Sequence, residues 1–317
     1  MVKAILPLIT GVLLFFSCYI DVPHDSRYDT LNPFGKSSIS IEVTDKDGMP
    51  LESAAVKLND TLVFYTNEDG VFSIGTFTYG DILIKIEKDE YRTFEKDTLL
   101  KTGVPLSLTV RMNYIPVIEN FHAYSSVRNI VSFEDTMEYN VNYTGLIKDK
   151  DGIGDIDSCI MNISGMKFKM NLSEEGALVK CSLNFSENNG YFQIYDLQGE
   201  NSYMEVFDKS GERILSSNAN LVRFIERLPI ILYPEDGGVL SLPDTIKWKR
   251  TSELFESYFQ MEIKDEFKTA FIADSINSAD SALYIDTLLN ENAYKMYLRL
   301  YDMFGNFSEN SIIFSVF

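Results

Sequence analysis

The chain has 317 residues, with 28 lysine and arginine residues against 47 aspartate and glutamate residues, so its formal net charge is −19. Such an acidic surface repels nucleic acid and anionic lipid head groups, and we therefore expect no nucleic-acid partner. Hydrophobic residues make up 45% of the chain and aromatic residues 13%, which is too apolar for a disordered protein and sufficient for folded cores.

The first residues have the pattern of a secretory signal. A lysine at the third position is followed by an apolar run over residues 4–16. A run of this length fits the core of a signal peptide and is short for a membrane-spanning helix. Ser17, a small residue, then precedes Cys18 where the run ends. We therefore expect a signal peptide over residues 1–17.

A small residue directly before a cysteine resembles the processing site of bacterial lipoproteins. This resemblance implies that the chain is cut before Cys18 and that lipid on the Cys18 thiol holds it on a membrane. Each buried methylene contributes about 0.8 kcal/mol, so two or more acyl chains anchor a protein durably. Tyr19 stands where an aspartate would imply retention in the inner membrane, which favours the outer membrane, with the protein surface-exposed or periplasm-facing. The alternative is an ordinary signal peptide whose cysteine stays free.

Residues 18–36 are rich in Asp, Pro, Ser and Asn and show little periodicity. This composition predicts a flexible tether between the lipidated cysteine and the folded part. The segment resembles the tether of lipoproteins from Bacteroidetes-like bacteria.

Past residue 36 the pattern predicts strands throughout. Apolar and polar residues alternate in short runs that Asp-Gly, Asn-Gly and Pro signals separate, which is typical of β-sandwiches and barrels. Prolines and the length of the chain favour several domains. We predict an all-β protein with three consecutive β-sandwich domains, over residues 37–113, 114–227 and 228–317.

The first domain contains three motifs in order. A D-x-x-G-x-P turn runs from Asp45 to Pro50, an A-x-V-x-L strand from Ala54 to Leu58, and a T-x-x-D-G-x-F segment from Thr66 to Phe72. This order resembles the carboxypeptidase regulatory-like domain, a transthyretin-like sandwich. The resemblance implies an accessory or scaffold module without catalytic residues.

The second and third domains look like copies of one design, because a strand, a D-x-x-G turn and a last strand close each of them. The turns begin at Asp208 and Asp302. This arrangement resembles the closing hairpin of immunoglobulin-like and fibronectin type III domains. The third domain also resembles the opening of a fibronectin type III domain, in which a tryptophan packs into the core. We interpret Trp248 as that core residue rather than as a platform for a sugar.

The strongest candidate for a metal site is an acidic turn. Asp149, Asp151, Asp155 and Asp157 place four carboxylates in nine residues, and calcium binds six to eight oxygen ligands. The spacing differs from that of an EF-hand loop, with glycine at the fourth position. A glycine-rich turn that leads into a strand explains the same residues without a metal, so calcium stays an alternative and we expect no other cofactor.

Two cysteines remain after the anchor. Cys159 and Cys181 alternate with apolar residues on separate predicted strands, so both should face the core of the second domain. A secreted protein permits a disulfide if the two strands pack closely, and two small buried hydrophobic residues are the alternative.

The sequence offers little for catalysis. It has two histidines, His24 and His122, and no H-E-x-x-H motif, G-x-S-x-G motif or phosphate loop. We therefore expect no enzyme but a membrane-anchored module for surface display, scaffolding or binding of a protein or polysaccharide partner. Two alternatives remain. The chain could be an accessory component of a carbohydrate-active or peptidase system with an inter-domain site, or an assembly component whose strand edge accepts a partner's strand.

Overall fold

The computed structural model describes residues 36–130, 136–173, 178–185, 194–251, 253–286 and 289–316. Within these ranges the chain consists of β-strands, their connections and two short 3-10 helices, η2 (Ile153–Asp155) and η3 (Ile194–Leu197). The prediction of an all-β fold is therefore confirmed. The described part of the chain contains no helix long and apolar enough to cross a membrane. The chain divides into two compact units, with the boundary between Ile115 and Pro116.

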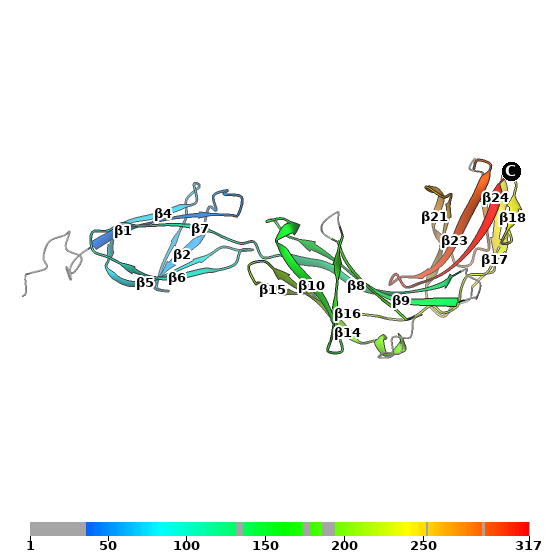
Figure 1. The fold of residues 1–317 in the computed structure, drawn as a ribbon, viewed down its shortest axis with the longest axis horizontal. Coiled ribbons are helices and arrows are strands. Elements are labelled where there is room, and N and C mark those ends of the chain that lie inside the picture. The colour runs from blue at the N-terminus through cyan, green and yellow to red at the C-terminus, as the bar shows by residue number, and fades with distance from the viewer. Residues whose placement is uncertain are drawn as a thin grey trace, which may run out of the picture. The chain divides into compact units, whose positions relative to one another are not determined.

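The first unit is a sandwich of two sheets (Figure 1). In one sheet β1 pairs antiparallel with β4 and parallel with β7, and in the other four antiparallel strands follow the order β3-β2-β5-β6. The bounds are β1 (Lys36–Thr44), β2 (Ala55–Leu58), β3 (Leu62–Tyr65), β4 (Val71–Thr78), β5 (Gly80–Glu87), β6 (Phe94–Leu100) and β7 (Leu106–Arg111).

The core of the first unit follows from the alternation in its strands. Successive side chains of a strand point to opposite faces, so every second residue turns inward. Ile39, Ile41 and Val43 of β1 are fully buried, and so are Val56 and Leu58 of β2. The residues between them lie on the outer faces of the two sheets.

The second unit contains three sheets. One sheet contains β10 (Ile156–Ile163), β11 (Met166–Lys169), β14 (Asn201–Asp208), β15 (Arg213–Leu215) and β16 (Ala219–Asn220). A small sheet contains β17 (Ile231–Tyr233), β19 (Asp244–Trp248) and β22 (Ala282–Ile285). The long sheet contains β8 (Val117–Ile130), β9 (Thr136–Lys148), β12 (Asn171–Leu172), β13 (Leu178–Asn184), β18 (Gly238–Leu240), β20 (Ser257–Lys264), β21 (Thr269–Asn277), β23 (Asn292–Asp302) and β24 (Phe307–Val316).

The long sheet runs through the whole second unit. Its order is β12-β13-β9-β8-β24-β23-β20-β21, and β18 pairs with β24. β8 and β24 pair in parallel at Ser126 with Phe307 and at Arg128 with Glu309. One half of the sheet covers a core with β10 and β14, and the other half covers a core with β19. Two sandwiches are therefore joined through one continuous sheet.

A buried polar joint, consisting of Ser125, Arg223, Asp302 and Asn306, holds the two halves together beside the β8–β24 pair. The backbone N–H of Ser125 donates to Asn306 Oδ1 at 2.8 Å, and its hydroxyl donates to the Arg223 carbonyl at 2.9 Å. Asn306 Nδ2 donates to Asp302 Oδ2 at 2.9 Å, and Arg223 Nε lies 3.2 Å from the same carboxylate oxygen. Asp302 and Asn306 are 1% and 0% exposed, so these polar groups depend on one another rather than on water.

One turn recurs four times in the two units. Its first residue is Asp or Asn, and that side chain accepts a hydrogen bond from the backbone N–H four residues later. Gly sits at the fourth position with φ between 72° and 84°, where other residues are strained. The pairs are Asp45 with Met49 at 2.8 Å, Asn67 with Val71 at 2.8 Å, Asp208 with Glu212 at 2.7 Å and Asp302 with Asn306 at 3.0 Å. At Asp208 and Asp302 this turn closes a hairpin, because it joins the paired strands β14 and β15 and the paired strands β23 and β24.

The second unit has two hydrophobic clusters, one drawn from residues before and the other from residues at and after Ile225. Trp248 lies in the second cluster, 1% exposed, and its ring meets that of Phe259 edge-on at 5.7 Å between centroids. The interpretation of Trp248 as a core residue is therefore confirmed. The domain ranges 114–227 and 228–317 remain a prediction, because a shared sheet connects the two clusters.

Candidate functional site

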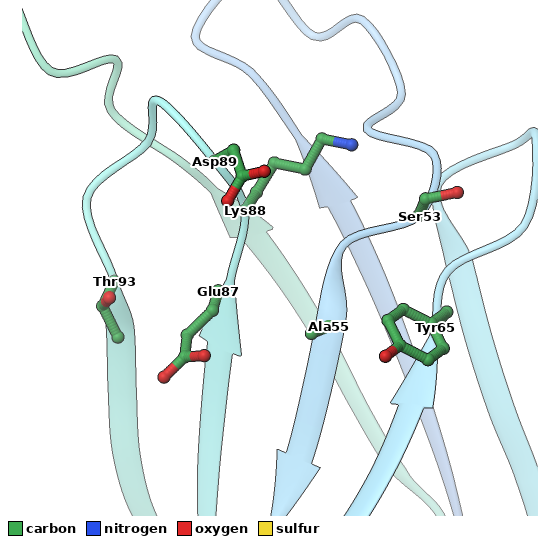
Figure 2. Close-up of a pocket in the computed structure, with 7 residues that line it drawn as sticks. All are labelled: Ser53, Ala55, Tyr65, Glu87, Lys88, Asp89 and Thr93. Carbon is green, nitrogen blue, oxygen red and sulfur yellow. The ribbon is translucent and has the colours of Figure 1, made fainter.

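The candidate site is a hollow of about 430 Å³ on the outer face of the sheet β3-β2-β5-β6 in the first unit. Figure 2 shows it at one end of β2 and β5, between the connections that follow β5 and precede β2. Its walls are Ser53, Ala55, Tyr65, Glu87, Lys88, Asp89 and Thr93.

The strand register explains why the sheet is hollowed here. Ala55 of β2 is the direct cross-strand partner of Tyr65 on β3 and of Glu87 on β5. Adjacent strands lie about 4.8 Å apart, so the backbones at Tyr65 and Glu87 are separated by about 10 Å. Ala55 extends only a methyl group between them, and the neighbouring Val56 faces the core. A short side chain between two long ones leaves the space open.

Tyr65 forms one wall of the hollow and is 66% exposed. Its ring lies beside Ala55 in Figure 2. Val63, the next outward-facing residue of β3, is 46% exposed and extends the apolar surface. An exposed aromatic ring with an apolar neighbour offers a flat contact surface that carries one polar group at its tip.

The opposite wall carries charged side chains of both signs, which are paired with one another. Glu87 pairs with Lys57 at 2.6 Å and with Lys85 at 3.3 Å, and Lys85 also pairs with Glu95 at 3.0 Å. The hydrogen bond from Lys57 is the main reason why the pKa of Glu87 lies below its usual value. The pKa of Lys85 is raised, because Lys85 donates hydrogen bonds to Glu95 and Glu87. Glu87 is therefore ionised at neutral pH and accepts hydrogen bonds, and it does not serve as a general acid.

Two groups close the end of the hollow at the turn after β5. Lys88 Nζ donates to the Glu52 carbonyl at 2.7 Å, which ties this turn to the connection before β2. The carboxylate of Asp89 lies on the same turn (Figure 2). Together with the hydroxyls of Ser53 and Thr93, these groups offer donors and acceptors along the hollow, and Thr93 lies at the side opposite Tyr65 (Figure 2).

The sequence did not single out these residues. Alternation on β2 assigns Ala55 to the outer face, but only the pairing of three strands brings Tyr65 and Glu87 to its two sides. The one available signal was a small residue at an outward position of a strand, where long polar side chains are usual. That signal alone does not identify the neighbours.

The acidic turn, for which calcium was the alternative to a metal-free turn, connects β9 and β10. Asp149 Oδ1 accepts from the Asp151 N–H at 2.9 Å, and the Asp155 carbonyl accepts from the Lys209 N–H at 2.8 Å. Asp157 is exposed on β10. Among the described residues no group of three or more His, Cys, Asp or Glu side chains is placed to hold a metal ion. Calcium binding at this turn therefore stays an alternative.

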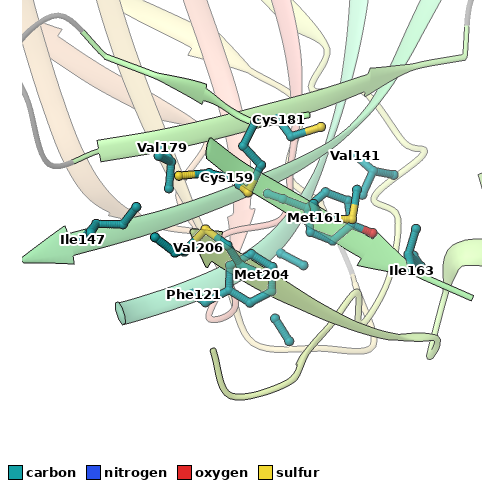
Figure 3. Packing of buried hydrophobic residues seen from close by; sticks show 14 of the residues in the cluster. Phe121, Val141, Ile147, Cys159, Met161, Ile163, Val179, Cys181, Met204 and Val206 are labelled. Atoms are coloured by element: carbon teal, nitrogen blue, oxygen red, sulfur yellow. The ribbon is translucent and has the colours of Figure 1, made fainter. Parts of the chain in front are cut away.

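Cys159 and Cys181 lie in the first core of the second unit, on β10 and β13, as free thiols (Figure 3). They are 3% and 9% exposed, which agrees with the predicted inward orientation. Burial raises the pKa of the Cys159 thiol to about 11, and burial also raises the pKa of Cys181. Both therefore behave as small apolar residues rather than as nucleophiles. Cys18, the predicted lipid attachment site, lies outside the described residues.

We expect Cys159 and Cys181 to resist labelling by a thiol reagent at pH 8 in the folded Cys18→Ser protein, because burial blocks access and keeps both thiols protonated. Both should react at once in urea. Replacing Ser182, the exposed neighbour on β13, with cysteine provides a matched control that should react in the folded state. Mass spectrometry of labelled peptides measures the result, and rapid labelling of Cys159 without urea would contradict it.

Comparisons with known proteins show weak similarity to solved structures. No family model matches the chain, and no curated protein matches it. BcpA, the major pilin subunit of Bacillus cereus, aligns with 89% of this chain and 98% of its own, at 10% identity and a TM-score of 0.30. A DUF3823 family protein from Parabacteroides merdae aligns with 59% of this chain and 99% of its own, at 14% identity and a TM-score of 0.25. The N-terminal Ig1-2 module of the Drosophila receptor protein tyrosine phosphatase DLAR aligns with 64% of this chain and 100% of its own, at 12% identity and a TM-score of 0.32. Such low scores do not assign the chain to a family.

Proposed function

We propose that this protein is a non-catalytic lipoprotein of the bacterial outer membrane that binds a protein or polysaccharide partner through the hollow beside Tyr65. The observation that carries this proposal is the 66% exposure of a tyrosine at the wall of an open hollow of about 430 Å³. A ring of this size loses apolar surface from water when a ligand covers it, which favours binding.

The charges at the hollow support binding rather than catalysis. Glu87, the carboxylate beside Ala55, is paired with two lysines, and its pKa is lowered. A general acid needs a raised pKa, which burial or a second carboxylate close by supplies. The cysteine thiols of the second unit are buried with raised pKa values and do not supply a nucleophile.

Membrane attachment rests on the sequence around Cys18. Replacing Cys18 with Ser should move the protein from the membrane fraction to the soluble fraction and abolish incorporation of a labelled fatty acid, because the hydroxyl cannot form the thioether. Cys181→Ser is the matched control, since this cysteine is buried in a core, and it should stay with the membrane. A Cys18→Ser protein that still sediments with membranes would show that something else attaches it.

The binding function is tested by capture with the full-length lipidated protein from its native membranes. We expect a partner to be retained by the wild-type protein and lost from Tyr65→Ala. Tyr284→Ala removes another exposed tyrosine, 62% exposed on β22, and should retain the partner. Capture of the same material by the wild-type protein and Tyr65→Ala would place the binding surface elsewhere.

A further inference from the structure

The hollow beside Tyr65 has the chemistry of a carbohydrate subsite. Pyranose rings present a face of C–H groups and a rim of hydroxyls, so they are recognised by an apolar plane flanked by hydrogen-bonding groups. Tyr65 supplies the plane, with Val63 exposed next to it on the same face of β3. Glu87, on the far side of Ala55, supplies a carboxylate, and strand spacing separates its backbone from that of Tyr65 by about 10 Å.

The size of the hollow fits such a ligand. Its volume of about 430 Å³ lies in the range of roughly 300–1,000 Å³ that is usual for small-molecule sites. Ser53 and Thr93 add hydroxyls, which both donate and accept, and Asp89 adds a second carboxylate. The hollow is open to solvent, so a sugar in it remains connected to further units of a chain.

Charge selects among carbohydrates. The chain carries a formal net charge of −19, so an anionic polysaccharide meets repulsion as it approaches. Lys57 and Lys85 are already paired with Glu87. Lys88, the lysine that lines the hollow, donates to the Glu52 carbonyl, and the carboxylates of Glu87 and Asp89 outnumber it there. A neutral sugar bears no such cost and can still donate its hydroxyls to the paired carboxylate.

We propose that the hollow formed by Ala55, Tyr65 and Glu87 binds one unit of a neutral hexose polysaccharide, with the sugar ring stacked on Tyr65. This inference rests on the proposed binding function and names its ligand class. An extended peptide is the competing occupant, because β3 is an edge strand and no described strand pairs with its outer side. β3 has four residues, so it offers a peptide few hydrogen bonds, which favours the sugar.

The test is native affinity electrophoresis of the Cys18→Ser chain through gels that contain hydroxyethyl cellulose, laminarin, galactomannan or soluble starch, with polygalacturonate as the anionic polymer. We expect at least one neutral polymer to retard the protein and polygalacturonate not to. Tyr65→Ala should weaken retardation by about tenfold or more, which equals a loss of about 1.4 kcal/mol. Tyr65→Phe, which keeps the ring, should preserve most of it.

Two further variants separate the site from a general effect on folding. Ala55→Leu fills the hollow and keeps Tyr65, so it should also abolish retardation. Tyr284→Ala should leave retardation unchanged, and circular dichroism should show that every variant is folded. Absence of retardation by all four neutral polymers, or equal retardation of Tyr65→Ala, overturns the carbohydrate assignment. If Tyr65-dependent capture of a protein persists in that case, the proposed binding function stands and its ligand is a peptide.

Discussion

Replacing Asp302 with Ala is expected to lower the free energy of unfolding of the second unit by about 3–5 kcal/mol, because it removes a buried carboxylate that is paired with the half-buried Arg223 and accepts several hydrogen bonds. The carboxylate is 1% exposed and accepts from the backbone N–H of Phe304 and Asn306 at 2.8 and 3.0 Å. Alanine would remove the acceptor of these two N–H groups. It would also remove the partner of the Asn306 side-chain amide and of the Arg223 guanidinium. Urea denaturation followed by the fluorescence of Trp248 measures the change.

Asp208→Ala is the matched control for this prediction. Asp208 begins the same type of turn, is 2% exposed, and accepts from Glu212 and Ser210 within its own hairpin. Asp302 differs because Asn306, which it holds, bonds Ser125 across the β8–β24 pair. We expect Asp208→Ala to cost less, about 1–3 kcal/mol. Equal losses in the two variants would show that the buried polar joint adds no stability beyond that of the turn.

Trp248→Ala should lower the free energy of unfolding by about 3–5 kcal/mol, because it leaves a large cavity in the second core of the second unit. The side chain is 1% exposed and contacts Phe259 edge-on. The indole N–H has no hydrogen-bond partner among the described residues, so Trp248→Phe removes an uncompensated polar group as well as volume. We therefore expect the phenylalanine variant to be clearly more stable than the alanine variant.

Far-UV circular dichroism during urea denaturation is the suitable measurement, because this substitution removes the single tryptophan of the chain. Tyr284→Ala on the neighbouring strand β22 provides the control, and its effect should stay within about 0.5 kcal/mol because the side chain is 62% exposed. A loss below about 1 kcal/mol for Trp248→Ala would contradict the core role of this residue.

Local patterns predicted the strands well, because burial on one face imposes a period of two. Ile39, Ile41 and Val43 are the clearest example, and all three are fully buried. The inward orientation of Cys159 and Cys181 follows from the same rule. The D-x-x-G turns were also predictable, because an aspartate that caps its own turn and a glycine with positive φ leave a short local signature.

The features missed from the sequence depend on long-range pairing. The parallel contact of β8 with β24 joins residues about 180 positions apart, so no local pattern in either strand specifies its partner. The hollow beside Tyr65 likewise requires the registers of β3 and β5 against β2. An outward-facing alanine indicates a hollow only when its cross-strand neighbours are known to be long side chains.

The parallel pairing of β8 with β24 has a mechanical consequence for the second unit. β8 enters the pair from its own N-terminal side, and β24 leaves it towards Val316. A pulling force applied to the start of β8 and the end of β24 therefore acts along both strands in opposite directions. The hydrogen bonds between them share that load in shear instead of opening one after another, so this unit should resist stretching between its ends.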